Sequence, residues 1–488
     1  MSDEELRELA DTVLMPCFDG LTTPDWLRRR VSRSLGAVCL FGRNIDTDAQ
    51  VRRLTDELRA ENPAVVIAID EEAGDVTRLD AGSGSPYPGN AALGRVDDVR
   101  LTRAIGEVVG GRLAAVGVTL NFAPCADVVA DPTNPVIGTR SFGSDPSLVA
   151  RHTEAFVVGH QAAGVAACAK HFPGHGGTDA DTHHRLAVLH ADLPALLTEA
   201  LPPFTAAIDA GVASVMAGHL LVPAVDDLPA SVSSRWLTDI LRGELAFDGV
   251  ITTDALEMQA LAGRYGLADS AVLALSAGAD LLCLGGQTRP EAELDSIVSG
   301  IVAAVHDGRL SEARLVDAAA RTTSLGTRFR SADPRPAVDR GVSDAVARRA
   351  LGVAGPLPTW REPVLVARCA DRPNMAVGQV PWGPGSVDPG LDQIDLSPDR
   401  PLPTDEIAAA GTVVVVTRDR HRNAWMSQRL AEIRRIRPDA VLLEMGITGV
   451  GSADAPGVAS YGATMANSTA ALAVLRASDT GDTVDRSA

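Results

Sequence analysis

The densest group of chemically reactive side chains in the sequence lies between Lys170 and His184. This stretch contains four histidines, two aspartates and one lysine. Its glycines and Pro173 indicate a loop that directly follows an apolar run. Histidine and aspartate side chains placed this closely could either hold a metal ion or transfer protons.

Metal binding requires that the ligands converge on one point. His171 and His175 have the four-residue spacing that brings two side chains together on a helix. Pro173 and the glycines around His175 disfavour a helix in this stretch. We therefore predict no metal and no other cofactor, with a metal-dependent barrel hydrolase as an alternative.

Acid/base catalysis does not require a helix in this stretch, because Asp181 and His183 can meet on a single turn of the loop. A carboxylate beside an imidazole orients the ring and raises its pKa, so that the imidazolium can donate a proton near neutral pH. In this alternative to metal binding, His183 is the general acid and base, and Asp181 is its partner.

A further carboxylate, Asp254, stands immediately after the apolar run Val250 to Thr253. An aspartate at the end of a strand can attack a sugar carbon, and it stabilises the positive charge that develops on the ring during glycosyl transfer. The same side chain could instead cap the helix that follows. Combined with the Asp181 and His183 pair, Asp254 favours a glycosidase.

Short apolar runs that alternate with helical stretches must position these side chains, which is the pattern of repeated βα units. We predict seven strands and find no clean eighth. The runs are Ala37 to Phe41, Val65 to Asp70, Val118 to Phe122, Val165 to Lys170, Ser214 to Ala217, Val250 to Thr253 and Asp280 to Leu284. Most of them end at polar residues, namely Asp70, Asn121, Lys170 with His171, His219 and Asp254. In a (β/α)8 barrel such ends converge on one face, so we predict an α/β fold with a TIM-like barrel. A doubly wound sheet is the alternative.

The chain is expected to contain two domains. We predict a catalytic barrel domain over residues 1–330, a linker over 331–342 that is rich in proline, aspartate and arginine, and a smaller C-terminal α/β sandwich domain over 343–488. In the second domain, Pro363 to Ala367, Thr412 to Thr417 and Ala440 to Glu444 read as strands, and Trp425 to Ile436 reads as an amphipathic helix.

Composition restricts the possible partners and location. The 488 residues carry a formal net charge of −19 at pH 7, which opposes binding to nucleic acid and to anionic lipid. The N-terminus lacks the basic and apolar regions of a secretory signal, and no apolar run approaches the about 20 residues that span a bilayer. The six cysteines form no CxxC pair. We therefore expect a cytoplasmic protein that binds a small neutral ligand and has no nucleic-acid or membrane partner.

The reactive segments resemble the motifs of one enzyme family. Lys170 to His183 is similar to the Lys-His-Phe-Pro-Gly-His-Gly and Asp-Ser-His motifs of the glycoside hydrolase family 3 β-N-acetylglucosaminidases, of the bacterial β-hexosaminidase type. Asp254 to Met258 resembles the Ile-Thr-Asp-Ala-Leu-x-Met nucleophile segment of the same family. Asn121 to Asp127 and Pro135 to Asp145 are also similar to it, so the resemblance spans Phe41 to Leu284.

This resemblance implies roles for individual residues. It makes Asp254 the nucleophile and His183 the acid/base, with Asp181 completing the dyad in place of the second carboxylate of most retaining glycosidases. It further implies that the sugar hydroxyls are bound by Asp70, Arg140, Lys170 and His171. His219 is a weaker candidate for substrate binding, because a histidine there could simply line the barrel.

The sequence departs from the family pattern at Asp75. The family usually reads Asp-x-Glu-Gly-Gly-Arg-Val where this chain has Asp70 to Val76, so Asp75 stands where a sugar-contacting arginine is expected. An acceptor replaces a donor, which could change the sugar or the group attached to it. We keep Asp75 as a candidate substrate-binding residue.

We therefore predict a retaining β-N-acetylhexosaminidase that cleaves terminal β-linked N-acetylglucosamine from cell-wall or chitin fragments through a glycosyl-enzyme intermediate. A phosphorylase that uses inorganic phosphate in place of water is an alternative, because an imidazole base tolerates an anionic acceptor that a carboxylate repels. A non-catalytic sugar-binding protein is another alternative.

Overall fold

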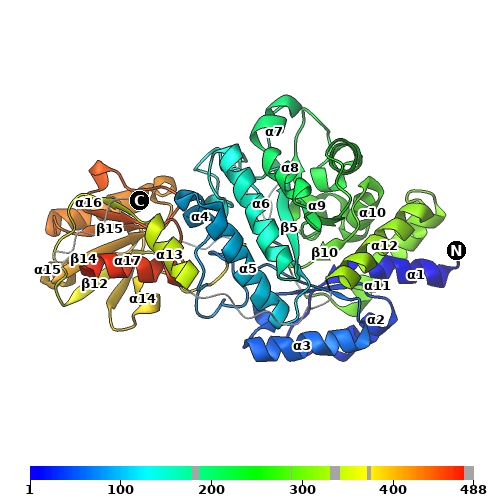
Figure 1. Ribbon diagram of the computed structural model, residues 1–488, viewed down its shortest axis with the longest axis horizontal. Coiled ribbons are helices and arrows are strands. Elements are labelled where there is room, and N and C mark those ends of the chain that lie inside the picture. The colour runs from blue at the N-terminus through cyan, green and yellow to red at the C-terminus, as the bar shows by residue number, and fades with distance from the viewer. Residues whose placement is uncertain (179–185, 287, 330–340, 371–374, 478–488) are drawn as a thin grey trace. The chain divides into compact units, whose positions relative to one another are not determined.

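The computed structural model describes residues 1–178, 186–286, 288–329, 341–370 and 375–477 (Figure 1). The chain forms two compact units. Unit 1 contains Met1–Glu72, Val99–Ile137 and Gly143–Asp339, and unit 2 contains Ala73–Asp98, Gly138–Phe142 and Arg340–Ala488. The predicted linker lies mostly outside the described residues, so the boundaries at 330 and 343 stay a prediction.

Unit 1 is a barrel of parallel strands with helices between them. The barrel strands are β1 (Leu14–Pro16), β2 (Ala37–Leu40), β3 (Val66–Ile69), β4 (Leu120–Asn121), β5 (Ala166–Phe172), β7 (Ser214–Ala217), β9 (Val250–Thr253) and β10 (Leu282–Leu284). The helices are α1 (Asp3–Thr12), α2 (Asp25–Arg33), α3 (Asp48–Glu61), α5 (Val99–Ala115), α6 (Pro146–Ala162), α7 (Leu193–Glu199), α8 (Pro202–Asp209), the π-helix η4 (Arg235–Glu244), α9 (Gln259–Tyr265), α10 (Leu267–Ala277), α11 (Glu291–His306) and α12 (Glu312–Arg328). Strands β6 (Ala187–Val188) and β8 (Leu220–Leu221) form a separate parallel pair.

The strands follow one another round the barrel in chain order. Six of them pair in the order β2-β3-β4-β5-β7-β9, and β10 pairs with β1. The parallel bridge between Thr252 and Leu281 joins β9 to the β10 segment, and β1 lies beside β2. This order is that of a (β/α)8 barrel, which confirms the predicted fold class.

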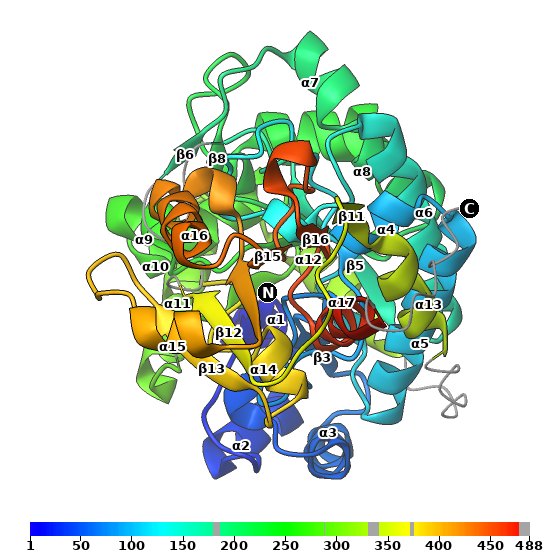
Figure 2. The same cartoon turned by 90° about the vertical axis from the view of Figure 1, so that its left-hand side faces the viewer.

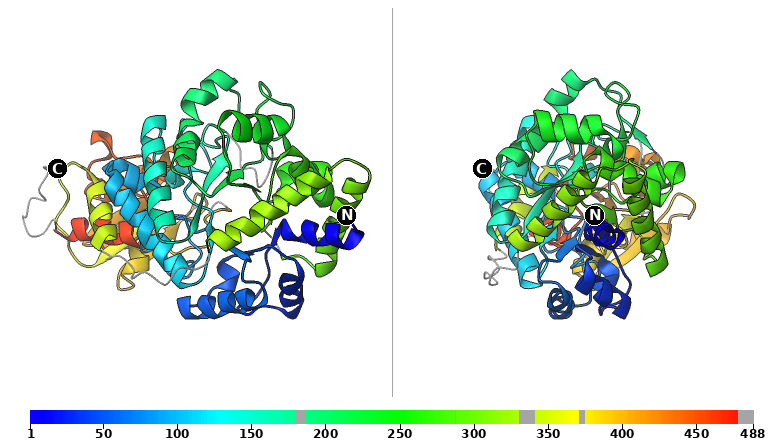
Figure 3. Two further views of the ribbon diagram at one scale, coloured as in Figure 1. Left: turned by 45° about the vertical axis from the view of Figure 1, so that its right-hand side comes forward. Right: turned by 90° about the vertical axis from the view of Figure 1, so that its right-hand side faces the viewer.

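Small and apolar side chains fill the barrel. Alternate residues of the strands point inward, as the two-residue period of a strand requires. The inward set includes Met15, Ala37, Cys39, Val66, Ala68, Leu120, Ala166, Cys168, Met216, Val250 and Cys283, all buried. Leu325 of α12 and Phe329 just beyond it join the same cluster. Figure 3 shows α1 beside α11 and α12.

The eighth strand is β1, which the sequence pattern did not reveal. It has only three residues and starts almost directly after α1 ends at Thr12. Its partner defines it, because Leu14 pairs with Leu282 and Pro16 with Leu284 on β10. The other seven predicted strands are confirmed as β2, β3, β4, β5, β7, β9 and β10.

Unit 2 contains a six-stranded sheet covered on both faces. Its strands are β11 (Gly352–Ala354), β12 (Val364–Cys369), β13 (Asp392–Leu396), β14 (Thr412–Thr417), β15 (Val441–Glu444) and β16 (Gly457–Ala459), in the order β11-β16-β15-β14-β12-β13. All pairs are parallel except β11 with β16. The helices are α4 (Asn90–Val96), α13 (Gly341–Ala350), α14 (Pro384–Val387), α15 (Thr404–Ala409), α16 (Ala424–Ile436) and α17 (Met465–Ala477).

Alternate residues of these strands divide between two apolar layers. Val413 and Val415 face a layer that includes Ile433 of α16, whereas Val414 and Val416 face a layer that includes Leu475 of α17. Figure 2 shows this sheet with its helices. The predicted α/β sandwich is confirmed, and the three predicted strands and the helix are β12, β14, β15 and α16.

Two short segments of the N-terminal half belong to unit 2. Residues 73–98 follow β3, and residues 138–142 follow β4. The first segment carries α4, which packs against α13 and against the turn η2 (Gly138–Arg140) of the second segment. Nothing in the local sequence pattern indicated this grouping. Among the described residues, no helix is both long and apolar enough to cross a membrane.

Candidate active site

Lys170 forms the centre of an ion-pair cluster at the carboxyl ends of β3 and β5. Its ammonium lies 2.5 Å from Asp70 Oδ1 and 2.7 Å from Glu72 Oε1. The Lys170 and Glu72 side chains are each 3% exposed, whereas that of Asp70 is 23% exposed. One cation therefore neutralises a buried carboxylate and also holds a second carboxylate that solvent can reach.

His171 is fixed by a carboxylate that follows β4. Its Nδ1 donates to Asp127 Oδ2 at 2.7 Å, because a carboxylate can only accept. The pairing of β5 with β7 shifts by one residue between Lys170 and Phe172, so His171 occupies an irregular position in the sheet. The hydrogen bond fixes the orientation of the His171 ring, and the irregular pairing sets the backbone position from which the ring projects.

Asp127 also holds the start of the histidine-rich loop. Its carboxylate accepts the backbone N–H of His175 at 2.6 Å and the thiol of Cys125 at 3.2 Å. Burial alone would raise the pKa of Asp127, but the charge and hydrogen bond of His171, together with His175, hold that pKa below its ordinary value. Asp127 is thus an anion that organises two histidines.

His175 itself is a neutral, buried side chain. Burial lowers the pKa of His175 to about 4, and the neighbouring His171 acts in the same direction. Its Nδ1 lies 2.8 Å from Thr178 Oγ1, and Asn134 Nδ2 donates to the His175 carbonyl at 3.0 Å. These bonds hold the described part of the loop as far as Thr178.

Asn121, at the end of β4, braces the loop that carries Asp70 and Glu72. It accepts from the Glu71 N–H at 2.9 Å and donates to the Glu71 carbonyl at 2.8 Å. A side-chain amide that imitates a strand neighbour in this way fixes the path of the backbone just after β3.

Asp254 directly follows β9 and is partly exposed. Its backbone N–H donates to the Ala217 carbonyl at 2.9 Å, and its Oδ1 accepts from the Ala255 N–H at 2.8 Å. His219 supports the same turn, because its Nε2 donates to the Ala255 carbonyl at 2.9 Å while Nδ1 lies 2.7 Å from Ser231 Oγ. His219 is fully buried.

The charged side chains at the strand ends also act on two core thiols. Burial raises the pKa of Cys168 on β5 to about 12, and the charges of Lys170, Asp70 and Asp254 all act on this thiol. Burial also raises the pKa of Cys283 on β10, and the charges of Asp254 and Asp70 act in the same direction. Because β3, β5 and β9 run parallel in one sheet, their carboxyl ends, with Asp70, Lys170 and Asp254, lie at the same end of the barrel.

The remaining predicted site residues fall into two groups. Arg140 and Asp75 are described and belong to unit 2, where Arg140 is 6% exposed and its carbonyl accepts from Asn90 Nδ2 at 2.6 Å. Asp181 and His183 lie outside the described residues. The catalytic roles of Asp254, His183 and Asp181, and the substrate contacts of the other residues, stay predictions.

Sequence reasoning overlooked Glu72 and Asp127 as parts of the site. Asp127 closes the motif Asn121 to Asp127, and its place after a strand whose end is polar was the available signal. Among the described residues, Cys125, Asp127 and His171 also bring a sulfur, an oxygen and a nitrogen within 4.8 Å of one another, a set that could hold a transition metal. The hydrogen bonds among them already account for their arrangement.

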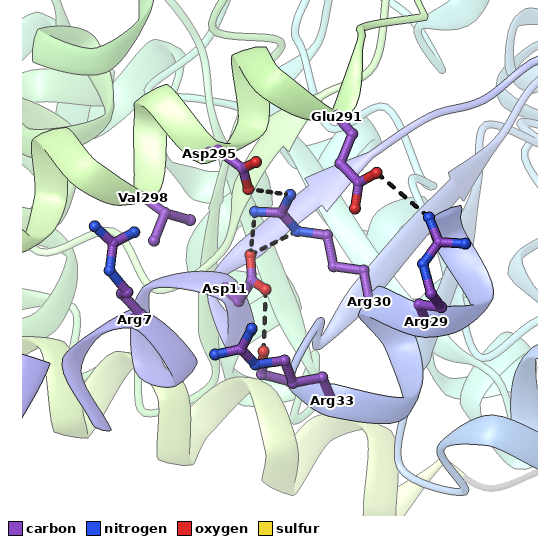
Figure 4. A pocket seen from close by; sticks show the side chains of 9 residues that line it. Arg7, Asp11, Arg29, Arg30, Arg33, Glu291, Asp295 and Val298 are labelled. Carbon is purple, nitrogen blue, oxygen red and sulfur yellow. Dashed lines mark hydrogen bonds and ion pairs between the residues drawn. The ribbon is translucent and has the colours of Figure 1, made fainter. Parts of the chain in front are cut away.

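A separate pocket of about 340 Å³ lies between α1, α2 and α11 (Figure 4). Arg30 dominates it and pairs with Asp11 at 2.6 Å and Asp295 at 2.9 Å, while Arg29 faces Glu291 at 3.7 Å. None of the described site residues lines this pocket. We interpret it as an ion-pair network between helices and not as the substrate site.

A barrel that gathers carboxylates, a lysine and histidines at its strand ends is the architecture of a TIM-barrel glycoside hydrolase. The profile of the Glycosyl hydrolase family 3 N terminal domain matches residues 22–325. The chain belongs to this family of glycoside hydrolases.

Individual relatives agree. The chain is 39% identical over 282 residues to a β-hexosaminidase of Chromobacterium violaceum. The aligned region covers 56% of this chain and 78% of that protein. A solved family 3 β-N-acetylglucosaminidase from a Paenibacillus species is 31% identical, with a TM-score of 0.84 and 97% of both chains covered. A β-N-acetylhexosaminidase of Beutenbergia cavernae is also 31% identical, with a TM-score of 0.59, and covers 66% of this chain and 98% of that one.

Proposed function

We propose that this glycoside hydrolase is a retaining β-N-acetylhexosaminidase that releases terminal β-linked N-acetylglucosamine from oligosaccharides such as cell-wall or chitin fragments. The observation that carries the proposal is the position of Asp254 at the end of β9, in the same parallel sheet whose strands β3 and β5 end at the ion pair of Asp70 and Lys170. N-acetylglucosamine is chosen as the sugar because the similar proteins include β-hexosaminidases and a β-N-acetylglucosaminidase.

In the proposed mechanism, Asp254 attacks the anomeric carbon and forms a glycosyl-enzyme, while His183, oriented by Asp181, protonates the leaving oxygen. His183 then takes a proton from the water that releases the sugar, so the configuration is retained. Asp70, Lys170 and His171 bind the sugar hydroxyls, together with Arg140. We also propose a cytoplasmic location, which the six buried cysteines support, since none of them forms a disulfide bond.

The proposal predicts that the chain hydrolyses 4-nitrophenyl β-N-acetylglucosaminide and that Asp254→Ala lowers kcat by at least about a hundredfold, because the transition-state cation loses its anion. Asp248→Ala is the matched control, since Asp248 precedes the same strand and is 93% exposed. Proton NMR should show the β-anomer as the first product.

Other outcomes would point to other functions. A phosphate-dependent sugar 1-phosphate product would identify a phosphorylase, and preferred cleavage of the β-glucoside would change the sugar. Loss of activity with a chelator would favour a metal-dependent hydrolase. Sugar binding without turnover would contradict the proposal and indicate a binding protein.

A further inference from the structure

Asp75 joins three separate parts of unit 2 through one carboxylate. Its Oδ2 accepts from Arg418 at 2.7 Å and from Thr139 Oγ1 at 2.6 Å, and its Oδ1 accepts the backbone N–H of Ala463 at 2.9 Å. The Asp75 side chain is only 3% exposed. A buried carboxylate with a cation and two further donors is a fixed anchor.

Arg418 occupies the place where sheets of this kind usually bind a ligand. It directly follows β14, and the strand order reverses between β12 and β14, since β13 lies on one side of them and β15 on the other. Open α/β sheets bind ligands outside the carboxyl ends of the strands at such a point. In this protein the guanidinium of Arg418 is instead paired with a carboxylate of the same chain, that of Asp75.

The backbone around Arg418 is held from both sides. Glu444 of β15 accepts from Thr417 Oγ1 at 2.7 Å and from the Asp419 N–H at 2.9 Å. These bonds tie the end of β14 to β15, so that Arg418 emerges in a set direction. The backbone on either side of Arg418 is therefore positioned by bonds that do not involve Asp75.

The residue next to Thr139 is Arg140, and its segment is clamped. Asn90 Nδ2 donates to the Arg140 carbonyl at 2.6 Å. Gly94 of α4 passes so close to the Phe142 carbonyl that an added Cβ would lie 1.7 Å from that oxygen. Asp75 holds the other end of the same segment through Thr139.

We propose that Arg418 is a positioning residue for substrate binding, which acts through Asp75 and Thr139 to fix the segment that carries Arg140. The inference rests on the proposed function, in which Arg140 binds the N-acetylglucosamine ring. It gives the C-terminal domain a defined task in the reaction and gives Asp75 a structural reason to be an acid where a donor was expected. Arg418 itself need not touch the sugar.

The test measures KM and kcat of the full chain with 4-nitrophenyl β-N-acetylglucosaminide. Arg418→Met should raise KM about tenfold while kcat changes much less, because one charge-assisted hydrogen bond that orders the site is lost. Arg418→Lys should recover part of the affinity, since a single ammonium can still reach Asp75. Asp75→Asn should resemble Arg418→Met.

Arg368→Met is the matched control. Arg368 lies on β12 of the same sheet, is 18% exposed against 20% for Arg418, and pairs with Asp395 at 2.8 Å. It should lose a comparable amount of stability in a thermal melt and keep KM within about twofold. An equal rise of KM in this control would show that general destabilisation is responsible and would overturn the inference.

A double-mutant cycle tests the route of action. If Arg418 acts through Arg140, then Arg418→Met should add almost nothing to the KM of an Arg140→Met chain, whereas fully additive effects would refute that route. An unchanged KM in Arg418→Met, with an active wild-type chain, would overturn this inference alone. Absence of cleavage by the wild-type chain would overturn the proposed function, and this inference with it.

Discussion

At the scale of single residues, the site depends on carboxylates that organise other groups. In unit 1, Glu72 and Asp70 both pair with Lys170. Asp127, also in unit 1, binds His171 and His175. In unit 2, Asp75 binds both Thr139 and Arg418. Each of these acids is paired where it is buried, which avoids the large cost of an isolated charge. The predicted nucleophile Asp254 differs, because it is partly exposed at a strand end.

Asp127→Asn should lower the free energy of unfolding by about 1–3 kcal/mol and raise KM for the N-acetylglucosaminide, because an amide nitrogen then faces buried N–H donors. Urea denaturation and initial rates measure the two effects. Cys125→Ala is the control, since it removes only a weak thiol donor to the same carboxylate and should leave KM unchanged. Equal effects of both changes on KM would contradict an orienting role for Asp127.

At the scale of elements, the close approach of α5 and α6 shows how glycines let barrel helices pack together. A Cβ at Gly110 of α5 would lie 2.8 Å from the His160 carbonyl and 2.9 Å from Ala163 Cβ. A Cβ at the neighbouring Gly111 would meet nothing within 4 Å. The helix packing therefore requires a glycine at position 110, whereas a larger residue fits at position 111.

Gly110→Ala should destabilise the protein by about 1–3 kcal/mol, because the added methyl forces the helices apart. Gly111→Ala should be neutral or stabilise by up to about 1 kcal/mol, because alanine favours the helix more than glycine does. Thermal or urea unfolding of the two variants decides between them. Similar effects of both changes would show that α5 and α6 do not pack as described.

At the scale of the whole molecule, stability should depend on pH through buried neutral histidines in unit 1. Burial lowers the pKa of His160 on α6 to about 4, and its Nδ1 donates to the Gly106 carbonyl at 3.3 Å. Burial has the same effect on the pKa of His175. In the unfolded chain both imidazoles would titrate near 6.5.

A histidine whose folded pKa is depressed binds protons more readily in the unfolded chain, so stability falls as the pH falls from about 6.5 to about 4. Between pH 7 and pH 5 each of the two histidines should remove about 2 kcal/mol. His160→Gln should flatten the dependence measured by urea denaturation at several pH values. His306→Gln, at a half-exposed histidine, should leave the slope nearly unchanged, and a slope that is the same in both variants would contradict the prediction.

The sequence determined those features that depend on neighbouring residues. Apolar runs of four to six residues predicted seven of the barrel strands and the centre of the second sheet, because burial on both faces of a parallel sheet leaves a local signature. The polar residue after each run predicted that Asp70, Lys170, His171 and Asp254 share one face. Contiguous motifs predicted the family. The roles of Asp181 and His183 rest on sequence alone, since both lie outside the described residues.

Only the tertiary structure decided the features that join distant parts of the chain. Strand β1 is too short to be recognised without β10, which lies far along the sequence. Asp127 is recognisable as the partner of His171 only once β4 and β5 lie side by side. Asp75 and Arg418 are 343 positions apart, so no local pattern could link the unexpected acid to its guanidinium. Such pairings depend on how many segments pack together, whereas the hydrophobic periodicity of a strand and its end can be recognised from a few consecutive residues.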